Sequence, residues 1–409
     1  MRRALWCTAA WACVVVARLG VVSAQTPMAP PLAPVSADQA RAAFQNDVHK
    51  AAGLTCATCH DTAHGDQYVA PARTAIPKLC GTCHANAEYI KKFNPQLRVD
   101  QLARYVTSTH GKQNAKGETR VAVCSDCHGA HGILGVKDPR APVYPTHVAE
   151  TCGRCHSDPA RMTPFNKPAT PPAEWATSVH AKALLERGDV SAPTCSTCHG
   201  GHGATPPDVE SVSLVCAQCH IREADLFRAS SKKALFETIS QPECVTCHSN
   251  HAIQHPQDAW VGFTDDTKCG KCHDESIPGA DVIKTVRGDL DQLNAAITTA
   301  AARLDRAEEA GVSVDDGRAA LREANDQRIN ARVMVHAFAA KPFTDVSTKG
   351  LQSAKLALAD GDRALGEVRY RREGLAVASV FIFGFLVTLG IKIRRLDQAR
   401  REPQKAKES

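Results

Sequence analysis

Most cysteines of this 409-residue chain occur in one short pattern. Of its 18 cysteines, all but Cys7 and Cys13 lie in blocks of the form Cys-x-x-Cys-His. The eight blocks begin at Cys56, Cys80, Cys124, Cys152, Cys195, Cys216, Cys244 and Cys269. Two thiols at this spacing can form thioether bonds with the two vinyl groups of one haem, and the imidazole that follows can then bind the iron.

The sequence therefore predicts eight covalently bound haem c groups, each with its iron. The second cysteines of the blocks are Cys59, Cys83, Cys127, Cys155, Cys198, Cys219, Cys247 and Cys272. The first axial ligands are His60, His84, His128, His156, His199, His220, His248 and His273. Structural zinc would not require a histidine after every second cysteine, and a thioredoxin-like site needs only one cysteine pair. A disulfide scaffold would not explain the histidines either.

A second set of histidines repeats with the blocks and could bind each iron from the opposite side. The blocks form four pairs, and a further histidine follows the first block of each pair: His64, His131, His202 and His251. Three pairs also have a histidine upstream: His49, His110 and His180. Beyond the first 24 residues methionine occurs only at positions 28, 162 and 334. We therefore predict two histidine ligands for all or nearly all irons, which favours low-spin iron of low potential.

The fourth pair lacks the upstream histidine, because Lys232 lies where the third pair has His180. The candidates for the missing ligand are His336, His255, His147, Lys232, or no ligand at all. His336 follows Val333 by three residues on an apolar helical stripe, so it is either a ligand or a packed core histidine. We predict that His336 is a ligand. An iron without a sixth ligand could instead be catalytic.

The paired blocks, with Cys-His-Gly-x-His-Gly and an upstream Ser-x-His, resemble the doubled-CXXCH multihaem cytochromes c, which are related to the class III, cytochrome c3-like group. The resemblance covers residues 46–275. It implies a compact, loop-rich fold around closely stacked haems that conduct electrons. Because aromatic residues make up only 5% of the chain, the haems must form much of the core, and we expect this region not to fold without them.

The two ends of the chain carry apolar segments of different kinds. Residues 1–24 have a positive start, an apolar stretch and small residues at the end, as in a secretory signal peptide. Residues 374–391 contain no charge and, at about 1.5 Å per residue, span roughly the apolar thickness of a bilayer. We predict a transmembrane helix over 372–393 and a basic cytoplasmic tail over 394–409. The haem region would then lie in the periplasm, anchored to the inner membrane by a single pass.

A region without cysteine, residues 276–371, separates the haem blocks from this segment. Apolar residues recur there four and three positions apart: Val286, Leu290, Leu293, Ile297, Ala300 and Leu304. We predict a first helix that ends at Gly311, a second that begins at Asp315 and stops before Pro342, and a third that continues into the membrane. Together they would form a helical stalk or bundle. Residues 25–45, rich in Pro and Ala, are predicted as a flexible leader.

The expected fold is mainly α-helix and loop: a multihaem cytochrome c fold organised around stacked haems, then a helical stalk or bundle and one C-terminal transmembrane helix. A net charge of +6 is too small to indicate a nucleic-acid-binding protein. We expect an electron carrier that exchanges electrons with periplasmic redox proteins and a membrane quinol-linked respiratory complex. The alternatives are a reductase of nitrite, hydroxylamine or a sulfur oxyanion at one open haem, and a cytochrome subunit of a larger membrane complex.

Overall fold

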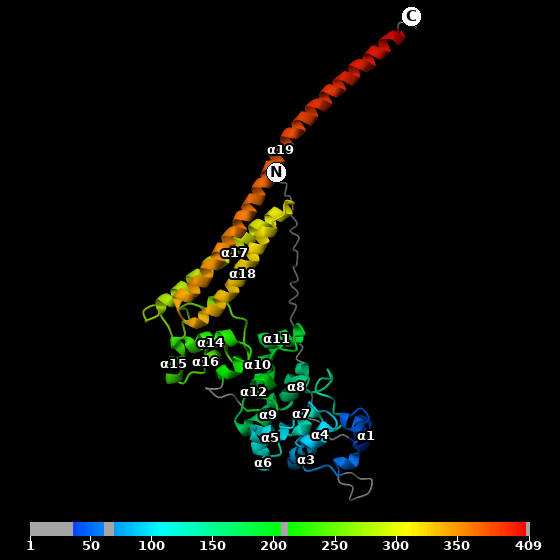
Figure 1. The fold of residues 1–409 in the computed structure, drawn as a ribbon, viewed down its shortest axis with the longest axis vertical. Helices are drawn as coiled ribbons and strands as arrows, with labels where there is room; N and C mark the ends of the chain where they lie inside the picture. The colour runs from blue at the N-terminus through cyan, green and yellow to red at the C-terminus, as the bar shows by residue number, and fades with distance from the viewer. Residues whose placement is uncertain (1–35, 61–68, 206–211, 406–409) are drawn as a thin grey trace, which may run out of the picture. The chain divides into compact units, whose positions relative to one another are not determined.

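The computed structural model describes residues 36–60, 69–205 and 212–405, and this part of the chain is helical, with no strand (Figure 1). It divides into two compact units. Of the described residues, the first unit comprises those up to 99 together with 113–172, and the second comprises 100–112 and those from 173 onward. The predicted signal peptide and His64 lie outside the described residues. Residues 37–44, within the predicted leader, form a helix because Ser36 and Gln39 make a capping box.

The cysteine-containing region is built from short helices, of which α8 is the longest with 12 residues. These helices are α1 (Ala37–Phe44), α2 (Val48–Ala51), α3 (Ile76–His84), α4 (Ala87–Lys91), α5 (Gln101–Thr107), α6 (Thr109–Ala115), α7 (Cys124–His128), α8 (Pro145–His156), α9 (Pro159–Met162), α10 (Pro171–Ala176), α11 (Val179–Glu186), α12 (Cys195–His199), α13 (Val212–Cys216), α14 (Ile221–Ala229), α15 (Ser231–Thr238) and α16 (Glu243–His248). Short 3-10 turns are η1 (Cys56–Thr58), η2 (Arg73–Ala75), η3 (Thr163–Phe165), η4 (Asp258–Trp260) and η5 (Val335–Ala337).

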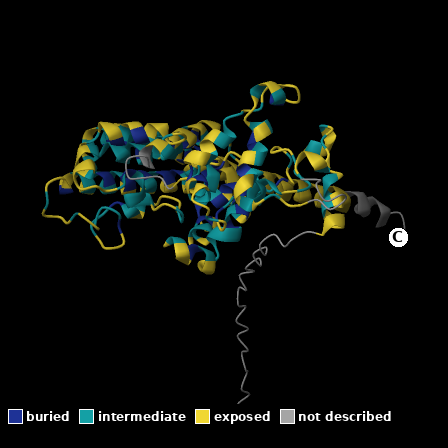
Figure 2. Cartoon of the chain, turned by 90° about the horizontal axis from the view of Figure 1, so that it is seen from below, coloured by how far each residue is buried: buried dark blue, intermediate teal, exposed yellow. Residues whose placement is uncertain are grey.

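The blocks themselves help to keep these helices short. Helices α7 and α12 end at the block histidine, and the glycine that follows has a positive φ, 86° at Gly129 and 81° at Gly200. Glycine adopts this left-handed conformation without steric cost, so the chain can turn away directly after the histidine. Most residues in these helices are half-buried or exposed (Figure 2). The helices therefore position side chains without forming a large side-chain core.

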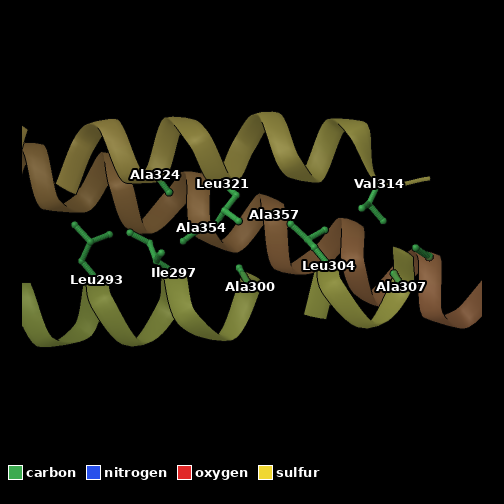
Figure 3. Close-up of a cluster of buried hydrophobic side chains, with 11 residues drawn as sticks. Leu293, Ile297, Ala300, Leu304, Ala307, Val314, Leu321, Ala324, Ala354 and Ala357 are labelled. Carbon is green, nitrogen blue, oxygen red and sulfur yellow. The ribbon is translucent and has the colours of Figure 1, made fainter. Parts of the chain in front are cut away.

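Three long helices follow: α17 (Ala280–Glu309), α18 (Asp315–Met334) and α19 (Ala340–Lys405). All six positions of the apolar stripe in α17 are buried, as the spacing predicted. In Figure 3, Leu293, Ile297 and Leu304 point from α17 toward the other two helices, where Leu321 and Ala357 meet them. Burying these side chains stabilises the bundle by roughly 25 cal/mol per Å² of apolar surface removed from water.

Close helix contact in this bundle depends on small residues. A Cβ atom at Gly350 of α19 would lie 2.9 Å from Leu293 Cδ1, and one at Gly317 of α18 would lie 2.5 Å from Leu304 Cδ2. Real Cβ atoms do not approach other atoms so closely. Glycine at these two positions therefore allows the three helices to pack against one another over their length.

The boundary between α18 and α19 differs from the prediction. The second helix ends at Met334, where the chain turns through η5 and through Phe338, whose φ is 48°. Pro342 does not stop that helix but lies in the first turn of α19. Proline is tolerated there, because the first four N–H groups of a helix have no acceptor within the helix.

The base of the bundle is joined to the preceding cysteine-containing segment. Val261 packs with Val286, Leu290 and Phe343 in one buried cluster. Beside it, Asp258 of η4 accepts hydrogen bonds from Arg332 Nε and Nη2, each 2.8 Å, and its Oδ2 also accepts one from Asn294 Nδ2 at 2.8 Å. The bundle and the last two blocks therefore share one packed and hydrogen-bonded junction.

Helix α19 continues far beyond the bundle, as the sequence predicted for the third helix. It contains an 18-residue window of mean hydropathy 2.3, and none of that window is buried within the described structure. Its apolar side chains, such as Phe381, Phe383 and Phe385, are between 66% and 74% exposed. An exposed apolar helix of this length is a candidate membrane span.

Candidate functional site

The sixteen cysteines of the blocks are all described and are not joined in disulfides. They lie at intermediate or exposed positions, and none of them is a fully buried residue. Five block histidines terminate helices, namely His84, His128, His156, His199 and His248. The predicted thioether and proximal-ligand residues are thus presented on short, local turns.

Histidines from outside the blocks lie opposite block histidines at a recurring distance. The ring centroids are 5.9 Å apart for His49 and His84, 5.8 Å for His60 and His131, 6.4 Å for His180 and His220, 6.0 Å for His199 and His251, and 6.0 Å for His248 and His336. Each pair contains one block histidine and one histidine from another part of the chain. Three of the pairs are within about 21° of parallel.

This spacing fits an iron atom held between two imidazoles. Metal–imidazole bonds of about 2 Å on opposite sides of one ion place the ring centroids about 6 Å apart. The five measured separations lie between 5.8 and 6.4 Å. The block histidine of every pair directly follows the second of two cysteines. The residues present therefore fit a covalently attached haem with two axial histidines.

Hydrogen bonds to Nδ1 orient several of these rings. The Nδ1 atom of His60 donates to the Val69 carbonyl at 3.1 Å, and that of His336 donates to the Val333 carbonyl at 2.9 Å. His49 makes the same kind of contact with the Asp47 carboxylate, also at 2.9 Å. A proton fixed on Nδ1 leaves the lone pair of Nε2 available for a metal.

Burial favours the neutral form of three paired imidazoles, those of His131, His180 and His248. It lowers the pKa of His131 and of His180, and the facing imidazole lowers each of them further. The pKa of His248 falls to about 4 for the same main reason, with His336 as the next cause. Neutral imidazole is the form that binds a metal, so the surroundings of these rings match the predicted role.

The upstream ligands share one local structure. His49, His110 and His180 each occupy the second position of a short helix, in α2, α6 and α11. The residue two positions earlier accepts a backbone N–H through its side chain: Asp47 from His49 at 2.9 Å, Ser108 from Gly111 at 2.9 Å and Ser178 from Ala181 at 3.1 Å. This helix cap explains the Ser-x-His pattern and fixes the position of each upstream histidine at the start of its helix.

A second repeated contact connects each upstream helix to the following pair of blocks. Val48 N donates to the Ile133 carbonyl at 2.9 Å, Thr109 N to the Ala204 carbonyl at 3.0 Å, and Val179 N to the Ile253 carbonyl at 2.9 Å. In each case the acceptor lies two residues after a downstream histidine. The two kinds of non-block histidine are therefore carried by segments that are hydrogen-bonded to each other.

The observed pairs follow a simple order. An upstream histidine faces the second block of its own pair, as His49 faces His84 and His180 faces His220. A downstream histidine faces the first block of the preceding pair, as His251 faces His199. Because no fifth pair of blocks follows the fourth, no downstream histidine of a later pair can face His248. His336 from η5 lies beside His248 instead.

Four of the predicted ligands are placed in the structure without a measured partner distance. His110 is in α6, His202 lies in the loop after α12, and His128 and His156 end α7 and α8. Their roles stay predictions.

The candidates for the fourth pair differ in their contacts. His147 uses Nε2 to donate to the Pro139 carbonyl at 3.0 Å, which occupies the atom that an iron would need. His255 is exposed and bonded through Nδ1 to the carbonyl of the next residue. Lys232 is different, because its Nζ lies 3.0 Å from Nε2 of His273, the last block histidine.

Successive blocks are neighbours within each unit. In the first unit α3 packs on α7 and α7 on α8, and Cys80 shares a hydrogen bond with Cys124. In the second unit α13 packs on α16, and Cys216 shares a hydrogen bond with Cys244. In both units these neighbouring blocks are the second block of one repeat and the first block of the next repeat.

Electrostatic contacts show the remaining neighbours. Burial raises the pKa of Cys59, and Cys80 raises it further; burial likewise raises the pKa of Cys247, with Cys269 as the next cause. Burial also raises the pKa of Cys198, with Cys216 as the next cause, and it raises the pKa of Cys127, followed by Asp126 and then Cys155. Within each unit the four blocks therefore follow one another in space in the order of the sequence.

Sequence reasoning missed the residues that hold these ligands in place. Asp47 is 3% exposed and also accepts from Ile133 N through its second carboxylate oxygen at 2.8 Å. Asp258 and Arg332, which position the turn that carries His336, were missed too. The Ser-x-His pattern was visible and could have predicted the caps, whereas nothing local marks Asp258 as a partner of Arg332, 74 residues away.

Comparison with known families agrees with this geometry. A model of the class III cytochrome c family matches residues 159–273, and a model of cytochrome c3 matches residues 48–157. Neither the curated proteins nor the solved structures contain a match to the chain. The fold and its blocks define a c-type cytochrome that binds covalent haem c and transfers electrons. Residues 48–157 and 159–273 therefore belong to the multihaem, cytochrome c3-like group of class III cytochromes c.

Proposed function

We propose that this chain is a membrane-anchored cytochrome with eight haem c groups that passes electrons between a quinol-linked respiratory complex and redox proteins of the periplasm. One observation carries the proposal: within each unit the blocks are neighbours in the order of the sequence. Haem c supplies an iron that accepts and releases one electron. A series of adjacent attachment sites supports conduction along the chain more than the binding of one substrate.

The side chains contribute position and coordination. The cysteine pairs would attach each group at a fixed point of the backbone, and the paired imidazoles would bind its iron. Imidazoles that stay bound in both redox states would favour electron transfer, because little would have to rearrange. The hydrogen bonds at Nδ1 of His49, His60 and His336 hold the rings in one orientation and support this rigidity.

The membrane placement is supported by the ends of the chain. The first residues resemble a signal peptide, and the apolar part of α19 is followed by a tail rich in Lys and Arg. Positive residues favour the cytoplasmic side of a membrane span. We therefore propose that the haem region is in the periplasm and that the C-terminus is cytoplasmic.

The mass and the redox behaviour of the full-length holoprotein test this function. We expect the mature chain to carry the added mass of eight haems, and its Soret band to show complete reduction and reoxidation. Reduced protein should pass electrons to a soluble periplasmic acceptor without consuming nitrite or hydroxylamine. Sustained consumption of either substrate would support the reductase alternative, and a smaller mass would contradict the octahaem assignment.

A further inference from the structure

We propose that Lys232 is the sixth ligand of the iron bound at the last block, opposite His273. The inference rests on the haem attachment proposed above and adds the identity of one ligand. Lys232 Nζ lies 3.0 Å from His273 Nε2, the nitrogen that binds iron in a block histidine. The last site would then have one imidazole and one amine ligand, in contrast to the histidine pairs at the other measured sites.

The local structure around Lys232 matches that of the upstream histidines. Lys232 is the second residue of α15, as His49 is of α2 and His180 is of α11. Ser230, two positions earlier, caps the helix by accepting the Lys232 backbone N–H at 3.2 Å. The partner is also equivalent, because His273 ends the second block of the pair that follows Lys232.

The distance is compatible with coordination after a small movement. Two metal–nitrogen bonds of about 2 Å on opposite sides of one iron separate the two nitrogens by about 4 Å. Nζ would have to withdraw by about 1 Å from its present position. Lysine has a flexible four-carbon stem, and such a change needs only side-chain rotation.

Two nearby lysines and His336 have different partners. Lys233 Nζ lies 2.7 Å from Glu237 and 2.6 Å from Glu243. Lys268 Nζ lies 4.5 Å from the ring centre of Trp260. His336, the predicted ligand for this pair, stands beside the other block histidine, His248. Lys232 is therefore the side chain that the structure brings to His273.

Coordination by Lys232 would close the last iron to small substrates. An amine is also a different ligand from imidazole, since it donates a lone pair without an aromatic ring. We therefore expect one haem in eight to be low-spin and yet spectroscopically distinct from the others.

Two arginine variants give a matched test in the full-length holoprotein. Arginine retains the charge but does not lose its proton in proteins, so it cannot offer a lone pair to iron. We expect Lys232→Arg to convert one haem in eight to the high-spin ferric state and to bind one equivalent of cyanide. Lys233→Arg should change neither property. Lys232→His should keep all haems low-spin and make the last site resemble the others.

Near-infrared magnetic circular dichroism of the unchanged protein gives a second measurement, because it distinguishes amine from imidazole ligation without any variant. Its expected result is one amine-ligated haem. A high-spin haem in the unchanged protein, or a Lys232→Arg protein that stays entirely low-spin, would overturn the assignment. The mass of each preparation is determined separately. A full haem complement with unaltered spin states contradicts the role of Lys232 alone, whereas a deficit in the unchanged protein contradicts the octahaem function.

Discussion

The helical bundle and the block-containing region obtain their stability in different ways. In the bundle, Leu293, Ala300, Leu304 and Ala357 are fully buried, and side chains of three helices form a continuous core. Helices α7 and α12, in contrast, contain no buried residue. The bundle is thus a side-chain core, whereas the other region must bury apolar surface against its covalent cofactors. We therefore expect the bundle to fold without haem and the block-containing region to depend on it.

The largest expected effect comes from preventing haem attachment. Without haem we expect residues 46–275 to remain unfolded and to be cut readily by protease, since helices such as α7 and α12 contain no buried residue of their own. Residues 280–370 should survive as a helical fragment, identified by mass spectrometry and circular dichroism. The holoprotein is the control and should resist cleavage throughout. Equal resistance of both regions in the haem-free chain would refute the contrast.

A smaller effect, confined to one haem site, is expected at His336, which lies beside His248. Replacing His336 by alanine should leave the haem of His248 with one axial ligand and produce one high-spin haem in eight. The control is His147→Ala, because His147 donates to the Pro139 carbonyl. Electron paramagnetic resonance of both variants measures the difference. An unchanged spectrum in His336→Ala would mean that another group binds this iron.

Within the bundle, Leu304→Ala should reduce the free energy of unfolding by about 3 kcal/mol, from lost burial and the cavity left behind. Leu304 is 0% exposed, whereas Leu356 is 66% exposed, so Leu356→Ala serves as the control and should cost about 0.5 kcal/mol or less. Thermal unfolding followed at the helical signal measures both. The visible haem spectrum should stay unchanged in both variants, and a change in it would show that the two regions unfold as one.

The smallest effect is expected at the junction, where Asp258→Asn should cost about 1–2 kcal/mol by weakening the contacts with Arg332. Burial acts to raise the pKa of Asp258, but hydrogen bonds from Arg332 and Asn294 outweigh it and bring the pKa below its ordinary value of 3.8. A carboxyl with a lowered pKa stabilises the fold above its unfolded pKa, and this stabilisation is lost as the pH falls through the folded value. The variant should therefore differ from the parent at neutral pH and converge with it in strong acid.

Denaturant titrations at several pH values measure this difference. The exposed pair of Lys341 and Asp345 offers the control, because Asp345→Asn should have little effect at any pH. A constant difference between Asp258→Asn and the parent from neutral pH to strong acid would contradict the ionic origin of the contact.

Local patterns in the sequence predicted those features of the structure that depend only on residues close together in the chain. The block spacing predicts which cysteines attach haem and which histidines are proximal ligands, and these roles stay predictions. The stripe from Val286 to Leu304 correctly predicted a buried helix face. The prediction failed at Pro342, because proline is compatible with both a helix stop and a first helical turn, and only the packing of Phe343 into the bundle base decides between them.

Pairings between distant residues could not be predicted. His336 was a reasonable candidate ligand, but its partner His248 is far away in the sequence, and only the fold shows which ring it faces. The sequence showed Lys232 in place of a repeat histidine. Only the position of α15 in the fold shows that Lys232 lies near His273. Such choices depend on tertiary packing, which one sequence does not contain.

The length of helix α19 determines how far His336 lies from the apolar segment that begins at Gly374. At about 1.5 Å per residue, its part before Gly374 is about 50 Å long, and His336 lies just before its beginning. In the proposed placement, a quinol confined to the bilayer is too remote to reduce the haem beside His336 directly, because electron tunnelling decays steeply with separation. In this placement we expect the quinol-linked donor to reach that haem through a redox protein that extends from the membrane surface, and shortening α19 by whole helical turns should change which donors can reach it.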